Sequence, residues 1–144
     1  MLTIKKTAEL SSTELIEIMK QRVAVFVVEQ NCPYQEVDDA DFNDWHIILH
    51  EHEHIQAYAR VIDKGDYVTF GRVLVAEPFR GGQGLGRQIV SAALEMIADN
   101  FTGRPIKIQA QAYLQKFYES FGFQATSAVY LEDDIPHLDM QKIN

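Results

Sequence analysis

Residues 45–75 contain three runs of apolar and β-branched residues joined by very short polar turns. The runs predict strands at 45–50, 55–62 and 67–75, and the two turns between them, EHEH and DKGD, have only four residues each. Connections this short cannot return the chain to start a parallel neighbour, so the three strands form an antiparallel meander. Any fold for this chain must contain that meander.

Helical periodicity lies on either side of the meander. Ser11 to Glu14 has the form of a capping box, and apolar spacing predicts a helix at 12–28. The further elements expected along the chain are a helix at 84–98, a strand at 106–111, a helix at 113–121 and strands at 123–131 and 138–142. This order predicts an α/β (α+β) fold with a single mixed, mostly antiparallel sheet flanked by helices.

Length and charge restrict the classes of protein that remain. With 144 residues, the chain is expected to form one domain over 1–144. A net charge of -8 argues against binding to nucleic acid, which needs a basic surface. The single cysteine, Cys32, allows no intrachain disulfide, and no apolar run resembles a leader or a membrane span. We therefore expect a cytoplasmic protein that binds neither nucleic acid nor membrane.

A cluster of glycines carries the clearest chemical signal. Gly81, Gly82, Gly84 and Gly86 lie between an expected strand and an expected helix. Main-chain N–H groups and the helix dipole make such a corner an anion site. Two nucleotide motifs fail there: a Walker A loop needs Lys and Ser or Thr at 87 and 88, and a dinucleotide fingerprint needs a glycine at 87.

The corner and its flanking motifs resemble the GNAT-superfamily N-acetyltransferases, and more narrowly their ElaA-type members. The matching motifs cover most of the chain: Arg22-Val23, VFVVEQ (25–30), CPYQEVDDAD (32–41), His46, AYARV (57–61), GRVLV (71–75), RGGQGLG (80–86), AQAYLQKFYESFGF (110–123) and EDDIPH (132–137). The resemblance implies the GNAT fold, in which the sheet is splayed. One departure is the stretch from Arg80 to Gly86, which has seven residues where the family usually has six.

The resemblance also implies acetyl-CoA as cosubstrate, with no metal. Its pantetheine arm would pair with the strand at Val73, Leu74 and Val75, where a main-chain N–H polarises the thioester carbonyl. The diphosphate would lie at the glycine corner, on Gly81, Gly82, Gln83, Gly84, Leu85, Gly86 and Arg87.

The same resemblance suggests residues for the chemistry and for the acceptor. Tyr118 matches a tyrosine that serves as general acid in many relatives, and Glu29, Glu36 and His137 are candidates for the base or the pocket wall. The expected substrate-binding residues are Arg22, Phe26, Asp38, Asp41 and His46. An acidic pocket favours a primary amine as acceptor, either a small molecule or a peptide.

The expected function is thus transfer of an acetyl group from acetyl-CoA to an amine that attacks the thioester directly. Two alternatives stay open: a non-catalytic acyl-CoA-binding sensor or interaction module, and an acyltransferase like the acyl-homoserine-lactone synthases. Many relatives are dimers, so a homodimer is a further expectation.

Overall fold

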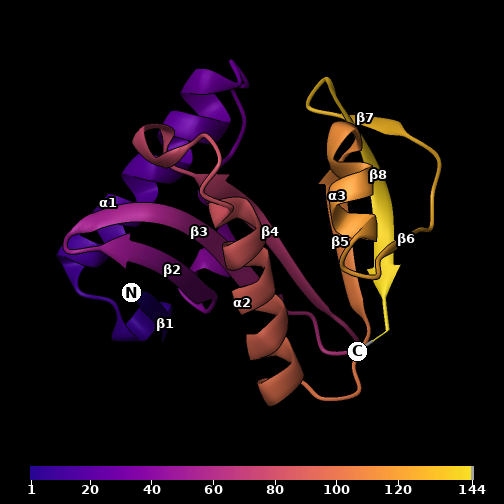
Figure 1. Cartoon of the computed structure of the whole chain (residues 1–144), viewed down its shortest axis with the longest axis horizontal. Helices are drawn as coiled ribbons and strands as arrows, with labels where there is room; N and C mark the ends of the chain where they lie inside the picture. Colours follow the sequence, from indigo (N-terminus) through magenta and orange to yellow (C-terminus); the bar gives the residue numbers. More distant parts are fainter. Residues whose placement is uncertain (144) are drawn as a thin grey trace.

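The computed structural model describes residues 1–143, which form one eight-stranded sheet with helices on both faces (Figure 1). The sheet order is β1-β2-β3-β4-β5-β8-β6, with β7 also paired to β8. Every pair is antiparallel except β4 and β5, which are parallel. The strands are β1 (Leu2–Lys6), β2 (Trp45–Glu51), β3 (His54–Asp63), β4 (Val68–Val75), β5 (Ile106–Gln111), β6 (Gln124–Ala125), β7 (Tyr130–Glu132) and β8 (Ile135–Lys142). The expected mixed, mostly antiparallel α/β (α+β) architecture is confirmed.

The helices begin close to where the sequence places them. The first, α1 (Ser12–Val23), is capped as expected, because Ser11 Oγ accepts the Glu14 N–H and Glu14 accepts the Ser11 N–H. It continues as a wider π-helix over Ala24–Glu29. The others are α2 (Leu85–Asn100) and α3 (Gln115–Glu119), with short 3₁₀ turns at Thr7–Glu9, Asp39–Phe42, Glu77–Phe79 and Ala112–Leu114.

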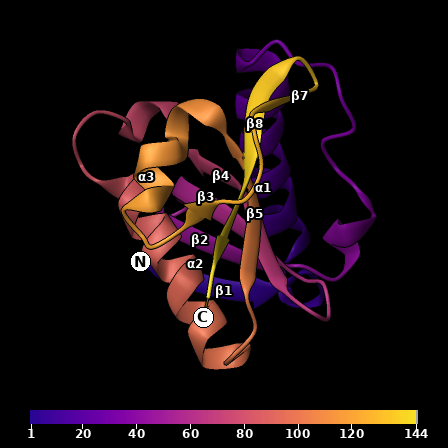
Figure 2. The same cartoon turned by 90° about the vertical axis from the view of Figure 1, so that its right-hand side faces the viewer.

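The two faces of the sheet bury separate sets of side chains, since neighbouring residues of a strand point to opposite faces. Ile47 and Ala59 belong to the core on the α2 face, whereas Ile48 and Tyr58 pack with Ile18 of α1. Figure 2 shows α2 and α3 on one side of the sheet and α1 on the other. The meander is therefore covered on both faces.

Three differences from the sequence-based expectations lie at the ends of the chain. The sequence pattern missed β1, an edge strand with alternately half-buried and exposed residues that give little contrast. The single strand expected at 123–131 is two short strands, β6 and β7, and both pair with β8. The last strand starts at Ile135 rather than at 138, because Asp133 and Asp134 form the turn between β7 and β8 with φ values of 50° and 64°.

Candidate active site

The strands β4 and β5 separate between the two halves of the sheet (Figure 1), and residues of both strands line a cleft there. The two strands are in register only at Val68 and Ile106, and the Val68 N–H donates to the Pro105 carbonyl at 3.0 Å. Beyond that rung they diverge around a cavity of about 1250 Å³ lined by both strands. The inner edge of β4 from Thr69 onward consequently has no partner strand, and its main-chain groups are available to a ligand except for the Val75 carbonyl, which accepts from Arg80 Nε.

An extra residue in β4 determines which side chains of the strand point to each of the two faces of the sheet. Tyr58 is opposite Leu74 and Arg60 is opposite Gly71, so Arg72 and Val73 together face the single residue between Tyr58 and Arg60. This is a β-bulge, and it reverses the alternation of the strand. Before it Phe70 packs on the α2 side, and after it Val73 does so while Leu74 packs on the α1 side.

The glycine corner joins the end of β4 to the start of α2. Gly81, Gly82 and Gly84 have φ values of 103°, 92° and 69°, and a Cβ on any of them would meet nothing within 4 Å. The glycines are therefore required for backbone conformation and not for packing. Gly84 is the N-cap of α2, whose first N–H groups lack intrahelical acceptors and so favour an anion. Gly86 lies in the first turn of α2, where its Cβ position is 3.9 Å from Val75.

Two arginines flank this corner in different ways. Arg87 lies on α2 with its guanidinium 4.5 Å from the Phe121 ring centre, and both terminal nitrogens contact Ser120 Oγ. Arg80 is turned back instead: its Nε donates to the Val75 carbonyl, and its two terminal nitrogens bind both carboxylate oxygens of Glu29 at 2.7 and 3.0 Å. Arg80 is therefore engaged by Val75 and Glu29, and the glycine corner that follows it consists of the six residues from Gly81 to Gly86.

Tyr118 lines the cleft from α3. Its ring is packed against Phe70, Phe117 and Phe123 with centroids 5.1 to 6.2 Å away. Its hydroxyl has no hydrogen-bond partner within residues 1–143. Burial, with a smaller contribution from Tyr113, raises the pKa of Tyr118 to about 12. The phenol is therefore protonated at neutral pH and is able to donate.

His137 also lines the cleft, on β8. Its Nδ1 is 2.7 Å from the Ile135 carbonyl oxygen, which can only accept, so Nδ1 carries the proton. In the neutral ring, Nε2 then keeps a free lone pair. His137 pairs with Gln111, which lies five positions after Ile106 on β5. Val73 likewise lies five positions after Val68, the residue of β4 that pairs with Ile106. His137 and Val73 both line the cleft, on β8 and β4 respectively.

Glu29 and Glu36 are both held by arginines. Glu29 lines the cleft, but the hydrogen bonds from Arg80 hold its pKa below the usual range. Glu36 is 4% exposed and contacts Arg22 through one carboxylate oxygen and Arg72 through the other. Neither carboxylate has the free, weakly held lone pair that a base requires.

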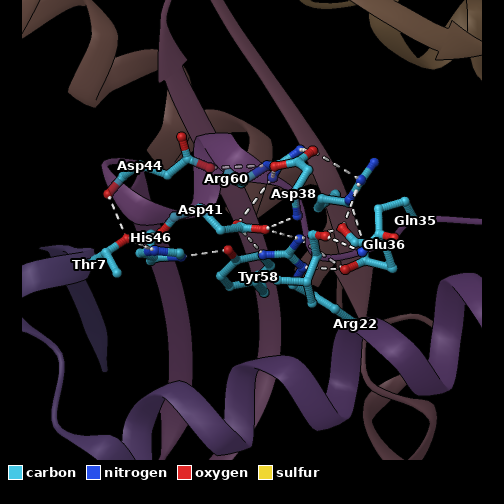
Figure 3. Close-up of polar contacts among 12 residues, drawn as sticks. Thr7, Arg22, Gln35, Glu36, Asp38, Asp41, Asp44, His46, Tyr58 and Arg60 are labelled. Atoms are coloured by element: carbon cyan, nitrogen blue, oxygen red, sulfur yellow. Dashed lines mark hydrogen bonds and ion pairs between the residues drawn. The ribbon is translucent and has the colours of Figure 1, made fainter.

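The expected substrate-binding residues divide into two groups. Phe26 and Asp38 line the cleft, whereas Arg22, Asp41 and His46 are buried and are absent from its walls. The buried residues form a polar network between α1, the sheet and the loop at 34–44 (Figure 3). Their burial argues for a structural role, and direct contact with substrate would require the protein to open.

Arg22 is at the centre of this network and is fully buried. It donates to both oxygens of Asp41 at 2.6 and 3.0 Å and to the side chain and carbonyl of Glu36. Arg60 joins it by contacts with Asp38, Asp41 and Asp44 at 2.7 to 3.3 Å. Paired charges of this kind are costly to break, since removing one partner leaves the other buried and alone.

His46 of β2 extends the network toward Thr7, which follows β1. Its Nε2 is 2.8 Å from Thr7 Oγ1 and its Nδ1 is 2.6 Å from the Tyr58 hydroxyl. Burial lowers the pKa of His46 to about 4 and raises that of Asp44 to about 7. Neutral His46 accepts one of these hydrogen bonds and donates the other.

Comparison with known proteins now identifies the family. Residues 14–144 match the "Acetyltransferase (GNAT) domain" family. The chain belongs to the GNAT acetyltransferase family. The ElaA-type resemblance is also confirmed, since the protein is 42% identical over 140 residues to Protein ElaA of Escherichia coli strain K12, which covers 94% of this chain and 91% of that one.

Solved structures agree with this assignment. The crystal structure of E. coli ElaA superposes with a TM-score of 0.93 at 40% identity, and an acyl-CoA N-acyltransferase from Pseudomonas aeruginosa with 0.93 at 39%; each match covers 99% of both chains. The acyl-homoserine-lactone synthase BjaI, solved with SAM and isopentyl-CoA, gives a TM-score of 0.80 at 15% identity over 98% of this chain and 82% of that one. At that identity the last match shows a shared fold alone.

Among residues 1–143, no group of three or more His, Cys, Asp or Glu side chains is placed to hold a metal ion. No helix within the same range is long and apolar enough to cross a membrane.

Sequence reasoning missed Arg72 and Tyr34, both of which line the cleft. The Arg72 guanidinium lies 5.3 Å from the centre of the Tyr34 ring. Both residues lie in the matching motifs GRVLV and CPYQEVDDAD, so the signal was present, but nothing in the pattern indicates that the two segments meet.

Proposed function

We propose that this protein transfers an acetyl group from acetyl-CoA to the nitrogen of a primary amine, which attacks the thioester directly. The observation that carries the proposal is the unpaired inner edge of β4, which runs through the cleft to the glycine corner. A strand edge with free N–H and C=O groups binds an extended amide-containing chain, and the pantetheine arm is such a chain. The corner at Gly81–Arg87 then accepts the diphosphate through main-chain N–H groups.

The main chain of β4 also supports the chemistry. A bound thioester running along this edge meets the strand at Val73 to Val75, which begin at the second bulge residue. A main-chain N–H placed at the carbonyl oxygen stabilises the negative charge that develops during attack, and such donors contribute strongly to catalysis. The residues that deliver and remove protons must lie at the same depth of the cleft.

His137 fits the role of base better than the two carboxylates. An alkylamine has a pKa of about 10.4 and must lose a proton before it attacks. His137 Nε2 has a free lone pair, while Glu29 and Glu36 are bound to arginines. His137 Nε2 accepts the ammonium proton before the attack, and the second amine proton leaves to solvent as the C–N bond forms.

Tyr118 completes the reaction as general acid. The C–S bond breaks as the new amide forms, and the sulfur leaves as a thiolate unless it receives a proton. The Tyr118 phenol lines the cleft and has no competing hydrogen-bond partner in the described chain. It donates its proton to the sulfur and regains one from solvent.

The test is release of free CoA thiol from acetyl-CoA in the presence of a panel of amines, with the acetylated product identified by mass. The panel includes small diamines, amino sugars, peptide N-termini and lysine side chains. Turnover with at least one amine is expected. Binding of acetyl-CoA with no turnover would support a sensor instead, and absence of binding by calorimetry with folded protein would refute both.

A further inference from the structure

Arg72 has a backbone conformation that is unusual for a residue with a side chain. Its φ is 51°, in the left-handed region that favours glycine, although it lies inside a strand. Arg72 is the first of the two bulge residues, a position at which a left-handed conformation is normally taken by glycine. Something in the structure must hold this arginine there.

The side chain of Arg72 provides that restraint through the loop at 34–38. Nη2 donates to the Glu36 carbonyl at 3.0 Å, and Nε lies 2.6 Å from Glu36 Oε1. Nη2 is also 3.6 Å from Asp38 Oδ2, and the guanidinium lies over the ring of Tyr34. One planar guanidinium thus contacts three residues of the loop, which a lysine could not reproduce.

The loop is itself fixed from the other side. Glu36 is bound by the fully buried Arg22 of α1, through Nε at 2.9 Å and through its own carbonyl. Asp38 is bound by Arg60 of β3 at 2.7 and 3.2 Å. Two arginines from the scaffold therefore hold the loop, and the third, Arg72, connects it to β4 (Figure 3 shows the loop and the two scaffold arginines).

We propose that Arg72 is a positioning residue that connects the loop at 34–38 to the β4 bulge and thereby aligns the main chain at Val73 with the thioester carbonyl. The kinetic part rests on the proposed function. The loop forms one wall of the cleft through Tyr34, Gln35 and Asp38, so the same contact links that wall to the strand that binds the cosubstrate. Arg72 acts on the reaction through Val73 and need not touch the reacting atoms.

The decisive variants are Arg72→Gly and Arg72→Lys. Glycine adopts the left-handed conformation without strain, so Arg72→Gly keeps the bulge accessible while releasing the loop. We expect kcat to fall at least tenfold, KM for acetyl-CoA to stay within threefold, and the thermal midpoint to change little because strain is relieved as contacts are lost. Arg72→Lys, which keeps the charge, should fall between Arg72→Gly and wild type, and it carries the test if the glycine variant does not fold.

Arg104→Gly is the matched control. Arg104 also bonds a carboxylate and a carbonyl, those of Asp63 and Gly65, but it is outside the cleft walls. Its replacement should leave kcat unchanged. Wild-type kcat in both Arg72 variants would overturn the proposal, and so would a fall in kcat matched by an equal rise in KM.

Amide hydrogen exchange supplies a readout that does not depend on activity. In the Arg72 variants, exchange should accelerate at 34–38 and at 73–75 together, and in Arg104→Gly at neither segment. Faster exchange at 34–38 alone would overturn the connection. If wild type acetylates no amine, the proposed function fails, and the exchange experiment still decides whether Arg72 connects the two segments.

Discussion

Tyr118 allows the effect of its ring to be separated from that of its hydroxyl. The ring is fixed by aromatic neighbours, so Tyr118→Phe should keep the packing and remove only the proton donor. General acids contribute typically about 10²-fold or more, and we expect kcat to fall by about that factor with KM for acetyl-CoA within twofold. Steady-state kinetics measure both constants. An equal loss in both, or in neither, would argue against the role.

The base is tested by replacing His137 and Glu29 separately with glutamine. If His137 takes the amine proton, His137→Gln lowers kcat/KM by about 10²-fold and changes the shape of its pH profile. Glu29→Gln, which leaves His137 in place, should keep the shape of the profile. If the wild-type pH profile of kcat/KM is kept in His137→Gln and lost in Glu29→Gln, Glu29 and not His137 is the base.

At the scale of elements, the glycine corner predicts that a substitution there weakens acetyl-CoA binding by more than its cost in folding stability explains. Gly84→Ala puts a side chain at φ 69°, which costs about 1–2 kcal/mol of folding free energy or shifts the loop. Because the loop's N–H groups are the proposed ligands, Kd for acetyl-CoA by calorimetry should rise at least tenfold.

Gly103→Ala is the control for that variant. Gly103 has φ 85° and, like Gly84, no atom within 4 Å of its Cβ position, but it follows α2 at the far end from the corner. It should lower the thermal midpoint similarly and leave Kd unchanged. Equal effects of both variants on Kd would mean that strain alone weakens binding.

The same scale explains which elements the sequence predicts. The meander, α1 and α2 follow from apolar periodicity and caps, because each buries one face in a contiguous core. The bulge in β4 does not, since its left-handed residue is Arg72, whereas the glycine beside it, Gly71, does not have a positive φ. The β6 and β7 segments also escape prediction, because strands of two and three residues are too short to show alternation.

At the scale of the whole molecule, the buried network makes opposing contributions to stability as pH falls. Burial lowers the pKa of His46 to about 4, below its unfolded value of about 6.5, so acidification across that window favours unfolding. Burial raises the pKa of Asp44 to about 7, above its unfolded value of about 3.9, so acidification across that window favours the fold. Between pH 6.5 and 4 the two effects oppose each other.

Asp44→Asn should separate the contribution of Asp44 to the pH dependence of stability from that of His46. Without the Asp44 contribution, the urea midpoint followed by circular dichroism should fall on acidification from about pH 6.5 to 4.5 more steeply than in wild type. Below about pH 4 both proteins should lose stability, because Asp41, though buried, is bound by Arg22, which holds its pKa well below the usual range. A wild-type slope in Asp44→Asn would contradict the assignment.

The candidate site was predictable only in part, for a reason that belongs to this scale. The cosubstrate corner is local in sequence, and Gly81 to Arg87 are close in space because they are close along the chain. The network joins α1, β3, β4 and the loop at 34–44, and a sequence pattern shows that Arg22 and Asp41 are present without showing that they meet 2.6 Å apart and out of solvent. Placement in motifs was therefore a poor guide to which acids face the cleft.

The two halves of the sheet share a single rung, but they also touch through rings, since Phe70 of β4 lies 6.2 Å from Tyr118 and 5.9 Å from Phe123. The width of the gap is thus set by aromatic volume. A smaller or larger residue at position 70 would rescale the space for the acyl group and would also displace the Tyr118 ring that packs on it, so acyl-group preference and proton donation would have to change together in evolution.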